Sequence, residues 1–164
     1  MAEFIVKWIY VLEKDYVYPT GKRIGKDYLF KDKDNKAWLK INKNGDFTII
    51  KGYAWDGATP KFCLFDIYFG VPDGVLHPDT LKPKTYYASL LHDVGYQFLK
   101  DGLPYSRKEV DQLFLKIMGA YDFRPRYIYY FAVRLLGGVA VSMTRWKRAT
   151  KGKKEEVKTG GEAI

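Results

Sequence analysis

The spacing of apolar and polar residues divides the chain into a strand-rich first third and a helical second half. Residues 4–12 are mostly β-branched or aromatic, which favours a β-strand. Residues 36–41 alternate between two faces, and the turn-forming sequence Asn-Lys-Asn-Gly follows at 42–45. Residues 47–50 then return as a second strand that reaches Trp55. This pattern predicts a small antiparallel sheet.

A long irregular segment follows at 56–83. It carries several prolines and an apolar cluster between Phe62 and Phe69. Compact domains seldom contain so long a loop without a function such as a lid or a docking surface. The alternative is that the segment packs across the sheet and completes the core.

Three helices are expected after this segment. The first covers about 84–100, where apolar residues recur at helical spacing, and Asp-Gly-Leu-Pro at 101–104 ends it. The second opens with Ser106 and Glu109, which form the capping-box pattern Ser-x-x-Glu. The third begins near Pro125, a residue suited to a first helical turn.

These elements predict an α+β fold in which a small N-terminal antiparallel sheet precedes a three-helix part. The 164 residues, 47% of them apolar, suit one domain over 1–150. That domain divides into a β-rich part at 1–55, the loop at 56–83 and a helical part at 84–150. Helices joined by a short Gly-Pro link normally pack antiparallel, so the first two should form such a pair. Residues 151–164 form a basic, polar tail.

The net charge of +9 comes from one region. Nine basic residues and no acidic residue occur between 124 and 154. Such a segment can contact nucleic acid, an anionic membrane surface or an acidic protein. The alternative is a basic helix end that complements the helix macrodipole and aids solubility.

Cysteine content and apolar runs limit the cellular setting. Cys63 is the only cysteine, so the chain can form neither an intrachain disulfide nor a thiolate metal cluster, and a reducing compartment is favoured. The first residues lack the pattern of a secretory signal. The longest apolar run, 128–143, contains Arg134 and is shorter than the roughly 20 residues that span a bilayer. We therefore expect a soluble protein.

The pair His92-Asp93 is the strongest candidate for chemistry. Burial in an apolar helix opposes charge on both groups, so a sequence that keeps them there usually gives them partners or a function. Tyr96 follows His92 by one helical turn, whereas Asp93 points about 100° away. In an antiparallel pair, Asp111 of the second helix can face His92 and Tyr96. There Asp111 would orient the imidazole and stabilise its protonated form.

Asp93 would then be left to hold a hard cation. Asp56 and Gly57, in the turn 55–60, could add a carboxylate and a backbone carbonyl. Ligation by oxygen alone suits calcium better than zinc. The cation would polarise an ester carbonyl while His92 deprotonates water. The simpler alternative is that His92 is a core residue with satisfied hydrogen bonds. His77 has no comparable surroundings and is interpreted as a loop residue.

Three segments resemble secreted phospholipases A2, especially the prokaryotic ones. His-Asp-Val-Gly-Tyr at 92–96 resembles their His-Asp-x-x-Tyr helix, Asp-Gly-Ala-Thr at 56–59 their calcium loop, and 106–118 their second catalytic helix. The resemblance implies that His92 is the general base, Asp111 its orienting partner and Tyr96 a supporting residue. It also implies that Asp93 and Asp56, with Gly57, bind calcium. The chain departs from the pattern in lacking disulfides, in having Ala58 where those loops carry a cysteine, and in a longer stretch between loop and helix.

The region from about Gly52 to Gly138 is also similar to a family of small proteins of unknown function encoded by bacteriophages and prophages. That resemblance implies a phage origin, in the host cytoplasm or the virion, and leaves the activity open. We expect a calcium-dependent acyl-ester hydrolase that acts on phospholipid or another ester at a membrane surface. One alternative is a non-enzymatic virion or accessory protein that docks on other phage proteins. Another is nucleic-acid binding alone, for which no recognised reading motif is present.

Overall fold

The structure is a computed structural model that describes residues 10–55, 57, 63–64, 67–68 and 76–135. Most of the predicted first strand, the candidate ligand Asp56, and the tail 151–164 lie outside the described residues. Within them, antiparallel strands precede helices, which confirms the predicted α+β fold.

The main sheet has four antiparallel strands in the order β2-β5-β4-β3. β4 (Ala37–Ile41) and β5 (Phe47–Ile49) are the two strands of the predicted hairpin, and Leu39 pairs with Ile49 across them. β2 (Tyr16–Tyr18) and β3 (Tyr28–Lys31) add one strand to each side of it, and the alternation had not singled them out.

Two short ladders lie outside this sheet. β1 (Tyr10–Val11) pairs antiparallel with β6 (Ala54–Trp55). β7 (Cys63–Leu64) pairs with β8 (Ile67–Tyr68), within the predicted long loop. That loop therefore contains a small hairpin of its own.

The helices begin and end close to the predicted positions. α1 (Tyr86–Phe98) continues into the 3-10 turn η1 (Leu99–Asp101) and stops at Gly102, whose φ of 84° is accessible to glycine at little cost. α2 (Arg107–Ala120) starts at Ser106 with both hydrogen bonds of the capping box. A third helix covers 126–135 in the described part of the chain.

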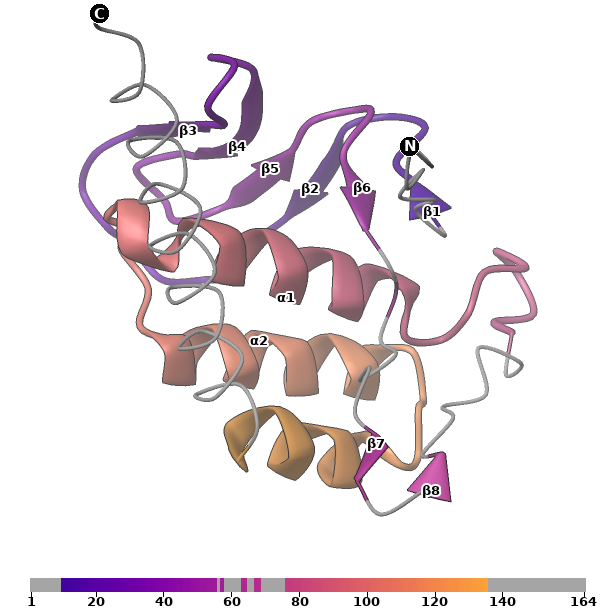
Figure 1. The fold of residues 1–164 in the computed structure, drawn as a ribbon. Helices are drawn as coiled ribbons and strands as arrows, with labels where there is room; N and C mark the ends of the chain where they lie inside the picture. The colour runs from indigo at the N-terminus through magenta and orange to yellow at the C-terminus, as the bar shows by residue number, and fades with distance from the viewer. Residues whose placement is uncertain (1–9, 56, 58–62, 65–66, 69–75, 136–164) are drawn as a thin grey trace, which may run out of the picture.

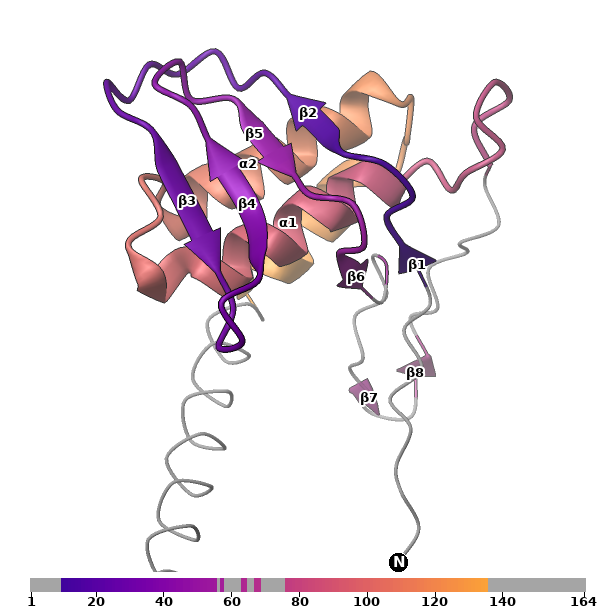
Figure 2. The same cartoon turned by 90° about the horizontal axis from the view of Figure 1, so that it is seen from above.

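The elements are stacked in layers, with the sheet on one side of the α1–α2 pair and helix 126–135 on the other (Figures 1 and 2). Aromatic side chains join the sheet to α1. The rings of Phe30 and Phe98 lie 5.4 Å apart, and those of Tyr16 and Tyr87 stack at 4.4 Å. Each such ring buries a large apolar area, so these contacts fix α1 against the sheet.

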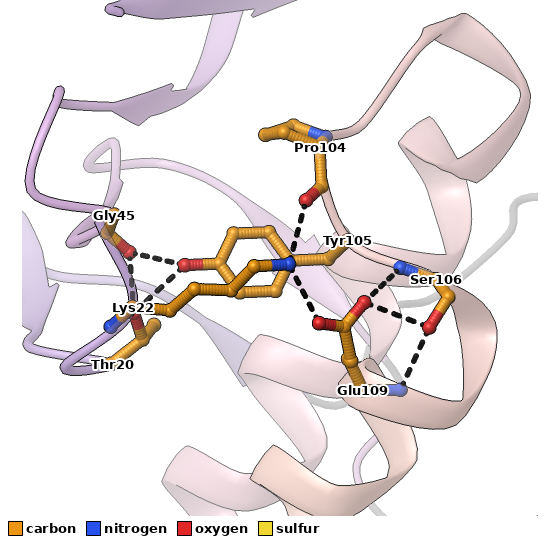
Figure 3. A network of polar contacts seen from close by, with 7 residues as sticks. All are labelled: Thr20, Lys22, Gly45, Pro104, Tyr105, Ser106 and Glu109. Carbon is orange, nitrogen blue, oxygen red and sulfur yellow. Dashed lines mark hydrogen bonds and ion pairs between the residues drawn. The ribbon is translucent and has the colours of Figure 1, made fainter. Parts of the chain in front are cut away.

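A polar network fixes the start of α2 to the sheet as well (Figure 3). The Tyr105 hydroxyl donates a hydrogen bond of 2.8 Å to the Gly45 carbonyl, in the turn between β4 and β5. Lys22 Nζ lies 2.6 Å from Glu109 Oε1, in the first turn of α2. A side chain at Gly45 would collide with the Lys22 carbonyl, so this turn requires glycine. The N-terminal end of α2, which leads to Asp111, is thereby held in place.

Candidate active site

A close approach of α1 and α2 creates the site. The two helices run antiparallel side by side (Figure 1), as the short link between them predicted. Gly95 of α1 faces Val110 of α2, and a Cβ added at Gly95 would lie 2.8 Å from Val110 Cγ1. Glycine is therefore needed at 95 for contact with α2. Because Gly95 lies between His92 and Tyr96, and Val110 precedes Asp111, the same contact sets the distances within the site.

Asp111 is the centre of the arrangement, and its side chain has no exposed surface. Its Oδ1 lies 3.1 Å from His92 Nε2 and accepts a 2.6 Å hydrogen bond from the Tyr96 hydroxyl. Its Oδ2 accepts a 2.9 Å hydrogen bond from Arg134 Nη1, in helix 126–135. The structure thus brings together His92, Tyr96 and Asp111, the three residues predicted for catalysis.

These partners decide the charge of the carboxylate. Burial alone would raise the pKa of Asp111, but hydrogen bonds from His92, Tyr96 and Arg134 outweigh it and hold that pKa below its ordinary value. Burial, followed by the nearby Asp111 carboxylate, raises the pKa of Tyr96, which therefore stays a neutral donor. Asp111 is therefore ionised, and its two oxygens bind donors from α1 and from helix 126–135.

The charge of Asp111 in turn governs His92. Burial of the ring opposes its charged form, but the carboxylates of Asp111 and Asp93 outweigh burial and raise the pKa of His92. Since an ionised Asp111 can only accept, His92 carries a proton on Nε2, and in the neutral ring Nδ1 holds the lone pair. The centroid of the imidazole lies 4.9 Å from that of the Phe114 ring and 4.1 Å from that of the Tyr96 ring, so two aromatic side chains pack against it. This geometry suits an oriented general base that takes up a proton at Nδ1.

Asp93 lies on the other side of the imidazole. Its Oδ1 is 3.8 Å from His92 Nδ1, and 37% of its side chain is exposed. An accessible carboxylate is a suitable oxygen ligand for a hard cation. Gly57 is described, with φ of 78°, whereas Asp56 lies outside the described residues. Asp93 is therefore the one predicted carboxylate ligand that the structure locates. In the described part of the chain no group of three or more His, Cys, Asp and Glu side chains is placed to hold a metal ion.

Two arginines belong to the site although the sequence reasoning did not assign them to it. Arg134 binds Asp111 directly, and Arg107 Nε lies 3.8 Å from Asp111 Oδ2. Arg107 also donates a 2.5 Å hydrogen bond to the Arg134 carbonyl. The spacing along α2 could have indicated Arg107, because a residue four positions before Asp111 lies on the same helix face. For Arg134, the sequence offered only the observation that this residue interrupts an apolar run.

The remaining candidate, His77, is a loop residue, as interpreted. Its Nδ1 accepts a 3.3 Å hydrogen bond from the Asp79 backbone, and its ring packs against Tyr121. His77 therefore helps to join its loop to the C-terminal end of α2.

Among the helices that the structure describes, none has the length and apolar character needed to cross a bilayer. Comparisons with protein-family models, with curated proteins and with solved structures find no match to this chain.

Proposed function

We propose that the protein is an acyl-ester hydrolase of the phospholipase A2 type, with His92 as general base and Asp111 as its orienting partner. The observation that supports this most directly is the 3.1 Å contact between His92 Nε2 and the fully buried Asp111 carboxylate. That contact fixes the ring and its tautomer and leaves Nδ1 as the proton acceptor.

The reaction follows from this arrangement. His92 Nδ1 takes a proton from water while the water oxygen forms a bond to the ester carbonyl carbon. The imidazolium is stabilised by Asp111, and the carbonyl oxygen becomes a tetrahedral oxyanion. When the carbon–alkoxide bond breaks, the proton on Nδ1 passes to the departing alkoxide and His92 is neutral again. Tyr96 keeps Asp111 Oδ1 in position through its 2.6 Å hydrogen bond.

Calcium is the cofactor that this proposal includes. Bound to Asp93 and, from the resemblance, to Asp56 and Gly57, it would supply positive charge to a developing oxyanion. The carboxylate of Asp93 beside the imidazole is compatible with that role. Phospholipid is the proposed substrate, and phage entry or release, from the host cytoplasm or the virion, is the proposed setting.

The first test is hydrolysis of a short-chain phosphatidylcholine, followed by the release of fatty acid. His92→Gln should lower the rate by about 100-fold or more, because general-base catalysis contributes at least that much. The matched control is His77→Gln, which changes the chain's other histidine and should leave the rate unchanged. Equal rates in both variants and the wild type, or no hydrolysis by the wild type with and without calcium, would refute the proposal.

Calcium binding is tested separately by the melting temperature. Calcium should raise the melting temperature of the wild type, and Asp93→Asn should lose that increase. Asp79→Asn is the matched control, since the Asp79 side chain is 86% exposed and lies outside the site. An unchanged calcium response in Asp93→Asn would remove Asp93 from the ligand set.

A second candidate function is supported by a different feature of the same residues. Asp111 binds side chains of α1, α2 and helix 126–135 at once, so it also serves as a structural centre of the helical part. A non-enzymatic phage virion or accessory protein could use this rigid scaffold for docking. Absence of hydrolysis, together with recovery of the protein in purified particles, would favour this function.

A further inference from the structure

Helix 126–135 carries a continuous exposed apolar surface. We call this surface the apolar ridge and define it by the side chains of Tyr127, Ile128, Phe131 and Leu135. Their exposed fractions are 54%, 68%, 60% and 77%. At 100° per residue the four lie within one sector about 100° wide. The ridge is therefore one face of the helix.

The other face of the same helix is packed against the protein. Tyr129 and Val133 lie against the hydrophobic core, and the ring of Tyr129 meets that of Phe123 edge-on at 5.1 Å. Arg134, at the margin of the ridge, binds Asp111 at 2.9 Å. The helix is thus anchored by its inner face, and it lies on the side of α2 away from the sheet (Figure 1).

The size of the ridge is within the range of functional apolar patches. Taking roughly 200 Å² for each whole side chain, the exposed part is about 500 Å², comparable with the largest apolar patch on a typical monomer. A stable protein–protein interface usually buries about 800 Å² on each partner, which the ridge alone does not supply. Partial insertion into a lipid surface needs no such complementary partner.

The charge around the apolar ridge indicates which kind of partner it binds. Arg124 is exposed just before the helix, and the guanidinium of Arg126 lies 5.0 Å from the Tyr127 ring. The nine basic residues from 124 to 154 are not accompanied by any acidic residue. A second copy would bring two positive surfaces together, and nucleic acid would leave the apolar side chains without a partner. Aromatic and aliphatic side chains flanked by arginines are typical of helices that lie in the interface of an anionic bilayer.

We propose that the apolar ridge docks the protein on an anionic phospholipid bilayer, with the helix axis along the membrane surface. This inference deepens the proposed hydrolase function and rests on it for the choice of phospholipid over other anionic surfaces. It specifies which surface of the protein contacts the lipid, and it connects that surface with the candidate active site. Arg134 belongs to the docking helix and binds Asp111, which in turn orients His92.

The test is sedimentation of the full chain with vesicles of phosphatidylcholine alone or of phosphatidylcholine and phosphatidylglycerol. Binding to the anionic vesicles should be stronger and should weaken as salt is added. Ile128→Ser with Phe131→Ser should weaken that binding by about tenfold or more, because both side chains would lose their insertion into lipid. The matched control is Leu29→Ser with Leu81→Ser, which removes two apolar side chains that are 51% and 74% exposed elsewhere.

The outcomes separate the docking proposal from the hydrolase proposal. Loss of binding in the ridge variant, with an unchanged melting temperature and full binding in the control, supports docking. Equal binding by both variants, or no vesicle binding by the wild type, overturns it. Dimers of the wild type that the ridge variant cannot form would also overturn it, by assigning the ridge to a second copy. Vesicle binding without hydrolysis leaves docking intact and refutes the hydrolase, whereas hydrolysis of short-chain lipid without vesicle binding does the reverse.

Discussion

Replacement of Gly95 by alanine tests the helix contact on which the site depends. The added Cβ would lie 2.8 Å from Val110 Cγ1, so Val110 must retreat by roughly 0.6 Å to reach ordinary van der Waals distance. Val110 is fully buried, so it has little room to move, and it directly precedes Asp111. Overpacking of this kind costs about 1–3 kcal/mol. Replacement of glycine by alanine within a helix stabilises the folded state by about 1 kcal/mol, which offsets part of that cost.

The net prediction for Gly95→Ala is a loss of about 1 kcal/mol in the free energy of unfolding, measured by urea denaturation. In a Val110→Ala background the collision is gone, so the same change should become stabilising by up to about 1 kcal/mol. Gly119→Ala in α2 is the matched control. A Cβ at Gly119 would meet Arg126 Cδ at an ordinary 3.6 Å, and this change should stabilise in the wild-type background. If Gly95→Ala stabilises the wild type as Gly119→Ala does, Gly95 and Val110 are not in the close contact described above.

Three further predictions concern charged groups. Asp111→Ala should cost about 1–3 kcal/mol in urea denaturation, because His92 and Tyr96 lose the buried acceptor of their hydrogen bonds; an unchanged stability would contradict this. The pKa of Glu109 is lowered from 4.5 to about 2, first by Lys22 and then by the Ser106 backbone, so its stabilising effect is complete above pH 4.5 and disappears as the pH falls toward 2. The excess stability of the wild type over Glu109→Gln should follow that course in thermal melts and stay below about 1 kcal/mol, since 36% of the Glu109 side chain is exposed. The pKa of His92 is raised above 6.5, so its stabilising effect is complete below pH 6.5 and is lost as the pH rises through the folded-state pKa. Proton NMR should show that pKa, and hydrolysis should increase through it, because the base must be neutral; a hydrolysis rate that falls over that interval would contradict the assignment.

Local sequence was sufficient for the elements whose signals are local. The capping box at Ser106 and the apolar spacing before it predicted the helices that the structure contains. The alternation at 36–41 and the turn after it predicted the central hairpin. β2 and β3 were not singled out, because they are short and their residues extend a sheet only once β5 and β4 are beside them.

The candidate site shows the same division. His92 and Tyr96 share a helix face by their spacing alone, and the short link between helices made Asp111 the expected partner. The role of Arg134 could not be predicted in this way, since 23 residues separate it from Asp111. Its contact exists only because helix 126–135 packs against α2, and packing of that kind depends on side-chain contacts between distant segments. The chain by itself therefore determined the helices, the hairpin and which residues could meet. Tertiary packing decided the charge state of Asp111 and which helix face remained exposed.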